Sequence, residues 1–263
     1  MAAKSSAPAV LVTRPAGPAS DGLCALLLAR GYRTHSQPLL ELHAAQELTP
    51  AQRRLVADLD QYQHVVFISA NAARFGLDCL QSSWPQWPPG LHWYAIGDAT
   101  ARLLSAQGIR ARVPGEEMTS EGLLALPALQ QLDEHRILIV KGEGGRDALL
   151  RAFTERGAQV DELACYRREC PQLAAGELAA RLQRWQPAAV LISSGEGLEN
   201  FTQLLRPAES TTVGATYMVV PSDRVARMAQ EMGFRNICIA KNASDAAMIR
   251  ALEECVPPAV SRT

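Results

Sequence analysis

Small polar and basic residues follow short apolar stretches at several places in this 263-residue chain, and Tyr166 stands next to Arg167 and Arg168 at the end of one such stretch. Hydroxyls donate hydrogen bonds and basic groups supply positive charge, so loops of this kind suit an anion. A phenol can also donate a proton to a leaving group. The pattern predicts a site for a ligand with several carboxylates or phosphates. The candidate loop residues are Thr13, Arg14, Ser69, Asn71, Gly97, Thr100, Lys141, Gly142, Arg146, Ser193, Ser194, Ser222, Lys241, Asn242 and Ser244.

Nucleophilic, metal and nucleotide chemistry find little support in the same sequence. It contains no G-x-S-x-G elbow and no H-E-x-x-H pair. Residues 142–146, Gly-Glu-Gly-Gly-Arg, resemble a phosphate-binding turn but complete neither G-x-G-x-x-G nor G-x-x-x-x-G-K-[ST]. The six cysteines form no C-x-x-C pair and no histidine cluster has metal-ligand spacing, so we expect free thiols in a reducing cytoplasm, with no metal and no cofactor.

The composition indicates a globular chain with a buried core, because 48% of its residues are hydrophobic and 20% are charged. The formal net charge of −1 argues against a general nucleic-acid binder or a membrane-surface protein. No apolar run reaches the roughly 18 residues that a transmembrane helix needs. The first ten residues lack the apolar segment of a secretory signal, which favours a cytoplasmic protein.

The chain repeats itself at a spacing of about 125 residues, and each repeated segment is a short apolar run followed by a helical pattern. Continuous apolar runs predict parallel strands that are buried on both faces. We expect Ser69, Ser193 and Ser222 to cap the helices that follow them. We also expect a helix to end wherever a glycine stands directly after a helical pattern. The paired segments are 11–18 with 137–146, 65–75 with 189–201, and 93–104 with 217–228; the glycines are Gly31, Gly108, Gly157 and Gly233.

These patterns predict an α/β fold of two similar flavodoxin-like lobes, each a doubly wound parallel sheet. Ligands of such sheets bind beyond the carboxyl ends of the strands, so two facing lobes would line a cleft with the candidate loops. A simple tandem arrangement places a linker near 127–136. Extended-looking segments at 37–41 and 163–168 instead allow the chain to cross between the lobes twice. The residues alone leave both arrangements open.

Several segments, taken in order, resemble the uroporphyrinogen-III synthase family from about residue 10 to about residue 252. They are LVTRP, VFISANAARF, YAIGDATARLL, ILIVKGEGGRDALL, GAQVDELACYRR and the weaker LISSGEGLENF and VVPSDRVA. The resemblance implies two α/β lobes joined by two extended linker strands, one lobe being built from both chain ends. It therefore favours residues 1–37 plus 168–263 as the first lobe and 38–167 as the second, with crossings near 37–41 and 163–168.

The resemblance also implies a cofactor-free reaction in which the linear tetrapyrrole hydroxymethylbilane loses its hydroxyl and closes with ring D inverted. The substrate carries eight carboxylates, and hydroxymethylbilane synthase would hand it over. Independently of the resemblance, the sequence shows no long apolar stripe, so we expect a monomer. Tyr166 matches the family tyrosine that serves as proton donor. The matching substrate-binding positions are Arg14 of the T-R-P segment, Ser69 and Asn71 of the S-x-N loop, Gly97 and Thr100 of the G-x-x-T-A loop, Lys141, Gly142 and Arg146, the repeated loop of Ser193 and Ser194, and Ser222 and Ser244 of the last two loops.

Two other classes of protein remain as alternatives. A two-lobed protein that binds a small anion without catalysis would share the predicted fold and loops. A nucleotide-dependent α/β enzyme would need a complete phosphate-binding motif, which the sequence lacks.

Overall fold

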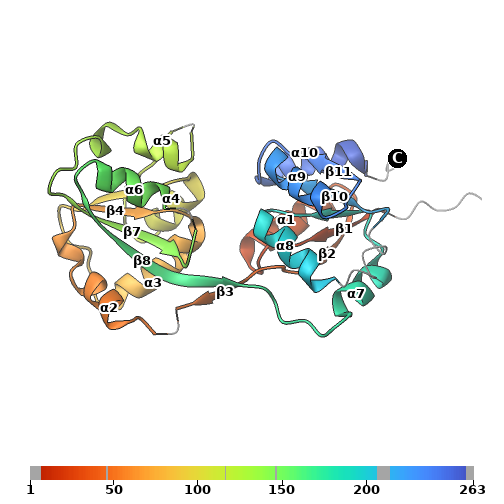
Figure 1. The fold of residues 1–263 in the computed structure, drawn as a ribbon, viewed down its shortest axis with the longest axis horizontal. Coiled ribbons are helices and arrows are strands. Elements are labelled where there is room, and N and C mark those ends of the chain that lie inside the picture. Colours follow the sequence, from red (N-terminus) through yellow and green to blue (C-terminus); the bar gives the residue numbers. More distant parts are fainter. Residues whose placement is uncertain (1–6, 46, 116, 146, 206–213, 259–263) are drawn as a thin grey trace, which may run out of the picture. The chain divides into compact units, whose positions relative to one another are not determined.

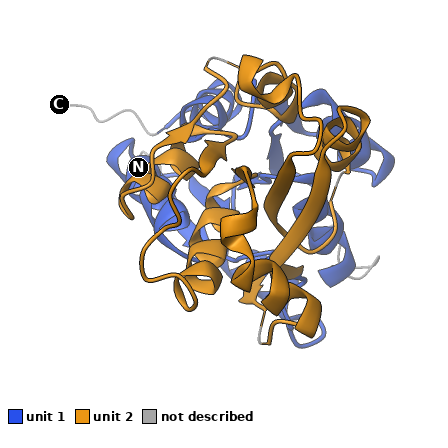
Figure 2. Cartoon of the chain, turned by 90° about the vertical axis from the view of Figure 1, so that its left-hand side faces the viewer, with its two compact units in different colours: residues 1–41, 169–263 blue, residues 42–168 orange. Residues whose placement is uncertain are grey.

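The computed structural model describes residues 7–45, 47–115, 117–145, 147–205 and 214–258. The chain forms two compact units, which Figure 2 shows in different colours. Unit 1 comprises Met1–Glu41 with Glu169–Thr263, and unit 2 comprises Leu42–Arg168. The chain leaves unit 1 within strand β3 (Glu41–Ala44) and returns to it within strand β8 (Gln159–Glu169).

Unit 1 contains a five-stranded sheet in the order β2-β1-β9-β10-β11, and all its neighbouring strands are parallel. The strands are β1 (Ala9–Val12), β2 (Arg33–Ser36), β9 (Ala189–Leu191), β10 (Tyr217–Val220) and β11 (Ile237–Ile239). Strand β1 is buried along its whole length, as its continuous apolar sequence predicts. Helices cover both faces of the sheet (Figure 1). One face carries α1 (Pro18–Ala29) and α10 (Asp245–Cys255); the other carries α7 (Glu177–Trp185), α8 (Gly195–Leu204) and α9 (Asp223–Glu231).

Unit 2 contains a six-stranded sheet in the order β3-β8-β7-β4-β5-β6, whose strands from β8 to β6 are parallel. Its remaining strands are β4 (His64–Phe67), β5 (His92–Ala95), β6 (Ala111–Arg112) and β7 (Arg136–Gly142). One face packs against α2 (Pro50–Ala57), α3 (Ala70–Gln81) and α4 (Asp98–Ser105), and the other against α5 (Ser120–Leu124) and α6 (Ala148–Glu155). Short 3-10 turns lie at Leu59–Gln61 and Pro127–Leu129. Within the described ranges, every helix is too short or too polar to cross a bilayer.

The five strands of the unit 1 sheet and the five strands from β8 to β6 of unit 2 have the same arrangement, although each set takes strands from both sequence repeats. In unit 1, β1 and β2 of the first repeat join β9, β10 and β11 of the second. In unit 2, β7 and β8 of the second repeat join β4, β5 and β6 of the first. Both five-stranded arrays have the order of a doubly wound sheet. The predicted α/β fold with two parallel sheets is thereby confirmed.

The ends of the helices follow the predicted chemistry with one exception. Ser69 and Ser222 cap α3 and α9, and Gly31, Gly108, Gly157 and Gly233 have φ angles of 86°, 76°, 86° and 92°. The prediction for Ser193 is wrong, because Ser194 caps α8 and accepts a hydrogen bond from the amide of Gly197 at 3.0 Å. Ile192 still donates to Val219 in the sheet, so the helix begins too late for Ser193 to cap it.

The expectation of free thiols is wrong for Cys238 and Cys255, which form a disulfide between β11 and the last residue of α10. Their Cα atoms lie 6.6 Å apart, because α10 packs on the strand from which its own chain has just emerged. This pairing is tertiary, and no cysteine motif announces it. Cys24, Cys79, Cys165 and Cys170 carry free thiols.

Breaking the Cys238–Cys255 bond should lower the free energy of unfolding. The bond closes a loop over a sequence separation of 17 residues, for which the chain-entropy model gives about 3 kcal/mol. Urea unfolding with and without reductant measures the loss, and Cys238→Ser with Cys255→Ser should remove the dependence on reductant. Cys24→Ser, which removes a free thiol, is the matched control. If the urea midpoint of the wild type is the same with and without reductant, the disulfide is contradicted.

A histidine cluster lies at the beginning of the unit 2 strands. The buried His64 places Nδ1 3.2 Å from the hydroxyl of Tyr94 and Nε2 3.0 Å from Nδ1 of His135. Burial lowers the pKa of His64 to about 4, and the neighbouring His135, His92 and Arg112 contribute in the same direction. His64 is therefore neutral in the folded protein at neutral pH.

Acidification should destabilise unit 2 through His64. An unfolded histidine takes up its proton near pH 6.5, whereas folded His64 does so near pH 4. Between these values the unfolded state holds more protons, so stability rises with pH and is lost as the pH falls from about 6.5 to about 4. Urea unfolding across this range should show the slope in the wild type and a smaller slope in His64→Gln. Equal slopes in the two proteins would refute the assignment to His64.

Candidate active site

The candidate loops lie at the carboxyl edge of each sheet. In unit 1 they follow β1, β9, β10 and β11, and in unit 2 they follow β4 and β5 or end β7. Because the strands that lead into the loops of one sheet are parallel, each unit collects its loops on a single edge. The unit 1 members are Thr13, Arg14, Ser193, Ser194, Ser222, Lys241, Asn242 and Ser244, and the unit 2 members are Ser69, Asn71, Gly97, Thr100, Lys141 and Gly142.

Four of these serines cap a helix and still keep a donor for a ligand. The Oγ atoms of Ser69, Ser194, Ser222 and Ser244 accept hydrogen bonds from backbone amides at 3.1, 3.0, 3.5 and 3.3 Å. Capping uses an oxygen lone pair and leaves the hydroxyl proton available. Each serine can therefore hold its helix and donate a hydrogen bond to an anion at the same time.

Tyr166 lies on β8 beside the end of β7. The ladder between these strands is irregular at Lys141 and Gly142, so that Gly142 pairs with Tyr166. The phenol ring covers Gly142 and stacks on Phe75 of α3, with 5.2 Å between the ring centroids. A Cβ atom at position 142 would lie 2.6 Å from Cζ of the ring, so only glycine leaves room for the phenol.

Tyr166 is held by packing. The residue is 4% exposed and belongs to the hydrophobic cluster around α3. Its hydroxyl forms no hydrogen bond with the residues that the structure describes, and it is not one of their fully buried side-chain atoms without a partner. A ring fixed by packing, with a hydroxyl that has no partner among these residues, suits a positioned proton donor.

Lys141 faces the opposite side of the unit 2 sheet from the Tyr166 ring. Its side chain is 7% exposed, and Nζ lies 2.8 Å from Oε1 of Glu162 on β8. The pair lines a cavity of about 170 Å³ with Ile139 and Leu149, on the face that α5 and α6 cover. The positive charge of Lys141 is thus already matched by a carboxylate within unit 2.

Arg14 is also engaged inside its own unit. Its guanidinium donates hydrogen bonds to the carboxylate of Asp245 and to the carbonyl of Ala243, and so joins the loop after β1 to the start of α10. Of the other candidates, Asn71 is half-buried in the first turn of α3, Thr100 is buried in the first turn of α4, and Gly97 directly precedes α4. Arg146 lies outside the described residues.

Three residues that shape this region are absent from the sequence-based candidates. Phe75 supports the phenol, Glu162 neutralises Lys141, and Asp245 binds Arg14. The alternation of a strand could have placed Glu162 on the face opposite Leu163, but only the register of β7 with β8 puts it beside Lys141. Arg14 and Asp245 come from opposite ends of the chain, so no local pattern connects them. In the described part of the chain, no group of three or more His, Cys, Asp or Glu residues could hold a metal ion.

Replacing Gly142 should disturb Tyr166 specifically. In Gly142→Ala the new methyl group overlaps the phenol ring, and the ring must move or strain its stack on Phe75. We expect a loss of about 1–3 kcal/mol in the free energy of unfolding, measured by urea denaturation. Gly22→Ala is the matched control, because position 22 is helical and has open space for the methyl group. A Gly142→Ala protein as stable as the wild type would contradict this packing.

Each unit is thus a doubly wound α/β domain with hydroxyls and amides at its carboxyl edge, which defines a duplicated α/β protein built to bind a ligand at its strand ends. A family model described as uroporphyrinogen-III synthase HemD matches residues 21–250. The chain belongs to the uroporphyrinogen-III synthase family.

Individual relatives agree with the family match. The uroporphyrinogen-III synthase of Salmonella typhimurium is 35% identical over 247 residues, which are 93% of this chain and 99% of the relative. That of Escherichia coli is 33% identical over the same shares of the two chains. The crystal structure of the Helicobacter pylori uroporphyrinogen-III synthetase has a TM-score of 0.62 at 17% identity, covering 94% of this chain and 99% of that one. A mutant uroporphyrinogen III synthase from Thermus thermophilus has a TM-score of 0.59 at 17% identity, covering 95% and 98%. These structures share the fold.

Proposed function

We propose that this chain, an enzyme of the uroporphyrinogen-III synthase family, converts hydroxymethylbilane into uroporphyrinogen III with Tyr166 as proton donor. The observation that carries the proposal at the site is the Tyr166 phenol, whose ring is held by Gly142 and Phe75 at the end of β7 and whose hydroxyl has no hydrogen-bond partner among the described residues. The proton goes to the leaving hydroxyl of the substrate, which departs as water and leaves an electrophilic azafulvene at ring A.

Closure with inversion requires that the substituted carbon of ring D attacks this azafulvene. The resulting spiro intermediate fragments and closes again with ring D turned. Hydroxymethylbilane also closes without help, but ring D then keeps its orientation. The enzyme therefore has to hold the linear tetrapyrrole so that the substituted carbon of ring D reacts. In favourable cases such orientation lowers the activation barrier by up to about 7–11 kcal/mol.

The substrate's eight carboxylates suit the donors that the loops present. Ser69, Ser194, Ser222 and Ser244 stand at the starts of four helices and keep a hydroxyl proton to donate. Helix starts also carry partial positive charge that favours anions. Arg14 and Lys141 already have carboxylate partners, so we propose that the binding of the substrate relies on hydroxyl and amide donors more than on these two cations. Asn71, Gly97, Thr100, Gly142 and Ser193 complete the proposed set, and Arg146 belongs to it on sequence grounds alone.

Product analysis tests the reaction itself. Freshly prepared hydroxymethylbilane incubated with the protein should give the type III isomer, which chromatography separates from type I after oxidation. Formation of type I alone would reject the proposed function. Tight binding of the tetrapyrrole without turnover would favour the alternative of a two-lobed anion-binding protein.

Tyr166→Phe should slow turnover without changing the isomer. A positioned acid contributes about 10²–10⁴-fold, and the electron-rich pyrrole assists departure of the hydroxyl, so we expect a loss of about 100-fold. The type III product should persist, because the hydroxyl does not hold ring D. Tyr217→Phe removes the hydroxyl of a half-buried tyrosine on β10 and is the matched control. A Tyr166→Phe enzyme with the wild-type rate would show that Tyr166 serves packing alone.

We further propose that the enzyme acts as a monomer that receives its substrate from hydroxymethylbilane synthase. Rapid capture matters because the free substrate closes to the unwanted isomer. The exposed large apolar side chains that the structure describes are spread over several elements; they include Leu26 and Leu28 of α1, Leu103 of α4 and Ile239 of β11. Light scattering of the purified protein should give the mass of one chain.

A further inference from the structure

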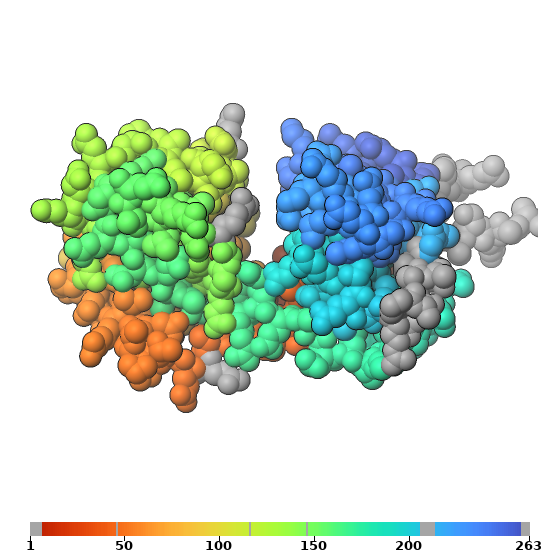
Figure 3. Space-filling model, viewed as in Figure 1, coloured from red at the N-terminus to blue at the C-terminus, as the bar shows by residue number. Residues whose placement is uncertain are grey.

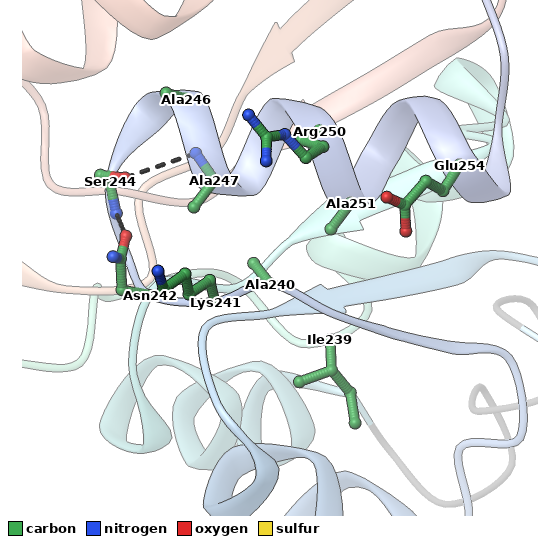
Figure 4. A pocket seen from close by; sticks show the side chains of 10 residues that line it. All are labelled: Ile239, Ala240, Lys241, Asn242, Ser244, Ala246, Ala247, Arg250, Ala251 and Glu254. Carbon is green, nitrogen blue, oxygen red and sulfur yellow. Dashed lines mark hydrogen bonds between the residues drawn. The ribbon is translucent and has the colours of Figure 1, made fainter.

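A groove lies in unit 1 between strand β11 and helix α10, in the blue region at the surface of Figure 3. Its volume is about 450 Å³, within the range of small-molecule sites. Figure 4 shows Ala247 and Ala251 pointing from the helix toward Ala240, with Lys241 next to Ala240; Arg250, higher on the helix, also lines the hollow. We refer to this hollow as the β11–α10 groove.

Two cations of the groove have no partner within the described part of the chain. Lys241 follows β11 and Arg250 lies on the exposed side of α10, and neither forms an ion pair or a hydrogen bond there. Arg14, by contrast, is bound to Asp245. The acidic residue that lines the groove is Glu254, one helical turn beyond Arg250. Among the residues described, the groove therefore carries two cations against one carboxylate, an excess of positive charge.

The floor of the groove is apolar. Ala240 and Ala251 are 3% and 4% exposed, and their small side chains leave room above them. Ile239 is 48% exposed at the rim and offers apolar surface to an occupant. An apolar floor beside two unpaired cations suits a flat, weakly polar ring that carries carboxylate arms.

Two further donors point to the same ligand. Asn242 Oδ1 accepts a hydrogen bond from the amide of Ser244 at 2.9 Å, and Ser244 Oγ accepts one from the amide of Ala247 at 3.3 Å (Figure 4). Both acceptor atoms are thus occupied, while the Asn242 amide protons and the Ser244 hydroxyl proton stay free to donate. What the groove offers is donors and positive charge, which match a carboxylate.

We propose that the β11–α10 groove binds the carboxylate arms of one pyrrole ring of the substrate, with Lys241 and Arg250 as its charged contacts. The inference rests on the proposed function, since each ring of a tetrapyrrole with eight carboxylates carries two of them on an apolar ring. It assigns a binding role to Arg250, which lies outside the loops at the strand ends.

Steady-state kinetics with hydroxymethylbilane test the assignment. Lys241→Ala and Arg250→Ala should each raise KM about 5-fold, since each removes one charged contact to a carboxylate. The increase should shrink as salt rises, because exposed charge pairs are screened. Lys241→Arg should restore most of the lost affinity, and Glu254→Gln should lower KM. Arg227→Ala removes an exposed cation of α9 outside the groove and is the matched control.

A binding measurement provides a readout besides activity. A monopyrrole that carries one acetate and one propionate should shift the methyl NMR signals of Ala247 and Ala251, and the shifts should disappear in the double variant K241A/R250A. If K241A/R250A keeps the wild-type KM and still forms the type III isomer, the groove does not bind the substrate, while the proposed function stands. Absence of the methyl shifts in the wild type overturns the assignment of the groove as well. Failure of the wild type to form the type III isomer rejects the proposed function instead.

Discussion

Both sheets depend on one central pairing of strands: β1 with β9 in unit 1, and β7 with β4 in unit 2. Each pairing joins a strand of one sequence repeat to a strand of the other, so neither sheet can form from one repeat alone. Both contacts lie at the centre of their sheets, where the strands are buried on both faces. Burial of these continuous apolar strands is the main favourable term. The parallel order that results brings the polar loops of each unit to one edge of its own sheet.

At these edges, one in each unit, the same atoms serve the fold and the proposed chemistry. A capping serine accepts from its helix and keeps a proton to donate, so binding an anion need not disturb the helix. Gly142 and Phe75 fix the phenol of Tyr166 by shape alone. Two charged residues that the sequence suggested, Arg14 and Lys141, instead form ion pairs with Asp245 and Glu162. A reaction controlled by orientation suits such a site, because it needs placement more than a strong reagent.

Sequence patterns predicted much of this because they are local. Apolar runs predicted the buried strands and glycines predicted the helix ends. The loops after the strands were identified without knowledge of the fold. The failures came from contacts between segments that are far apart in the sequence. Ser193 and Ser194 are adjacent and chemically identical, and the hydrogen bond from Ile192 to Val219 decides which of them caps α8. The environment of Lys141 depends on the register of β7 with β8, which a single strand cannot reveal.

The sequence by itself determined the class of fold, the positions of the loops and the presence of a phenol next to two arginines, because strand burial and helix capping depend on neighbouring residues. Only the tertiary structure decided which polar groups remain free to act. It brought Asp245 to Arg14, joined Cys238 to Cys255 and left Lys241 and Arg250 beside an open groove. These outcomes depend on packing between segments far apart in the chain, and a charge becomes a binding group only where that packing leaves it unpaired.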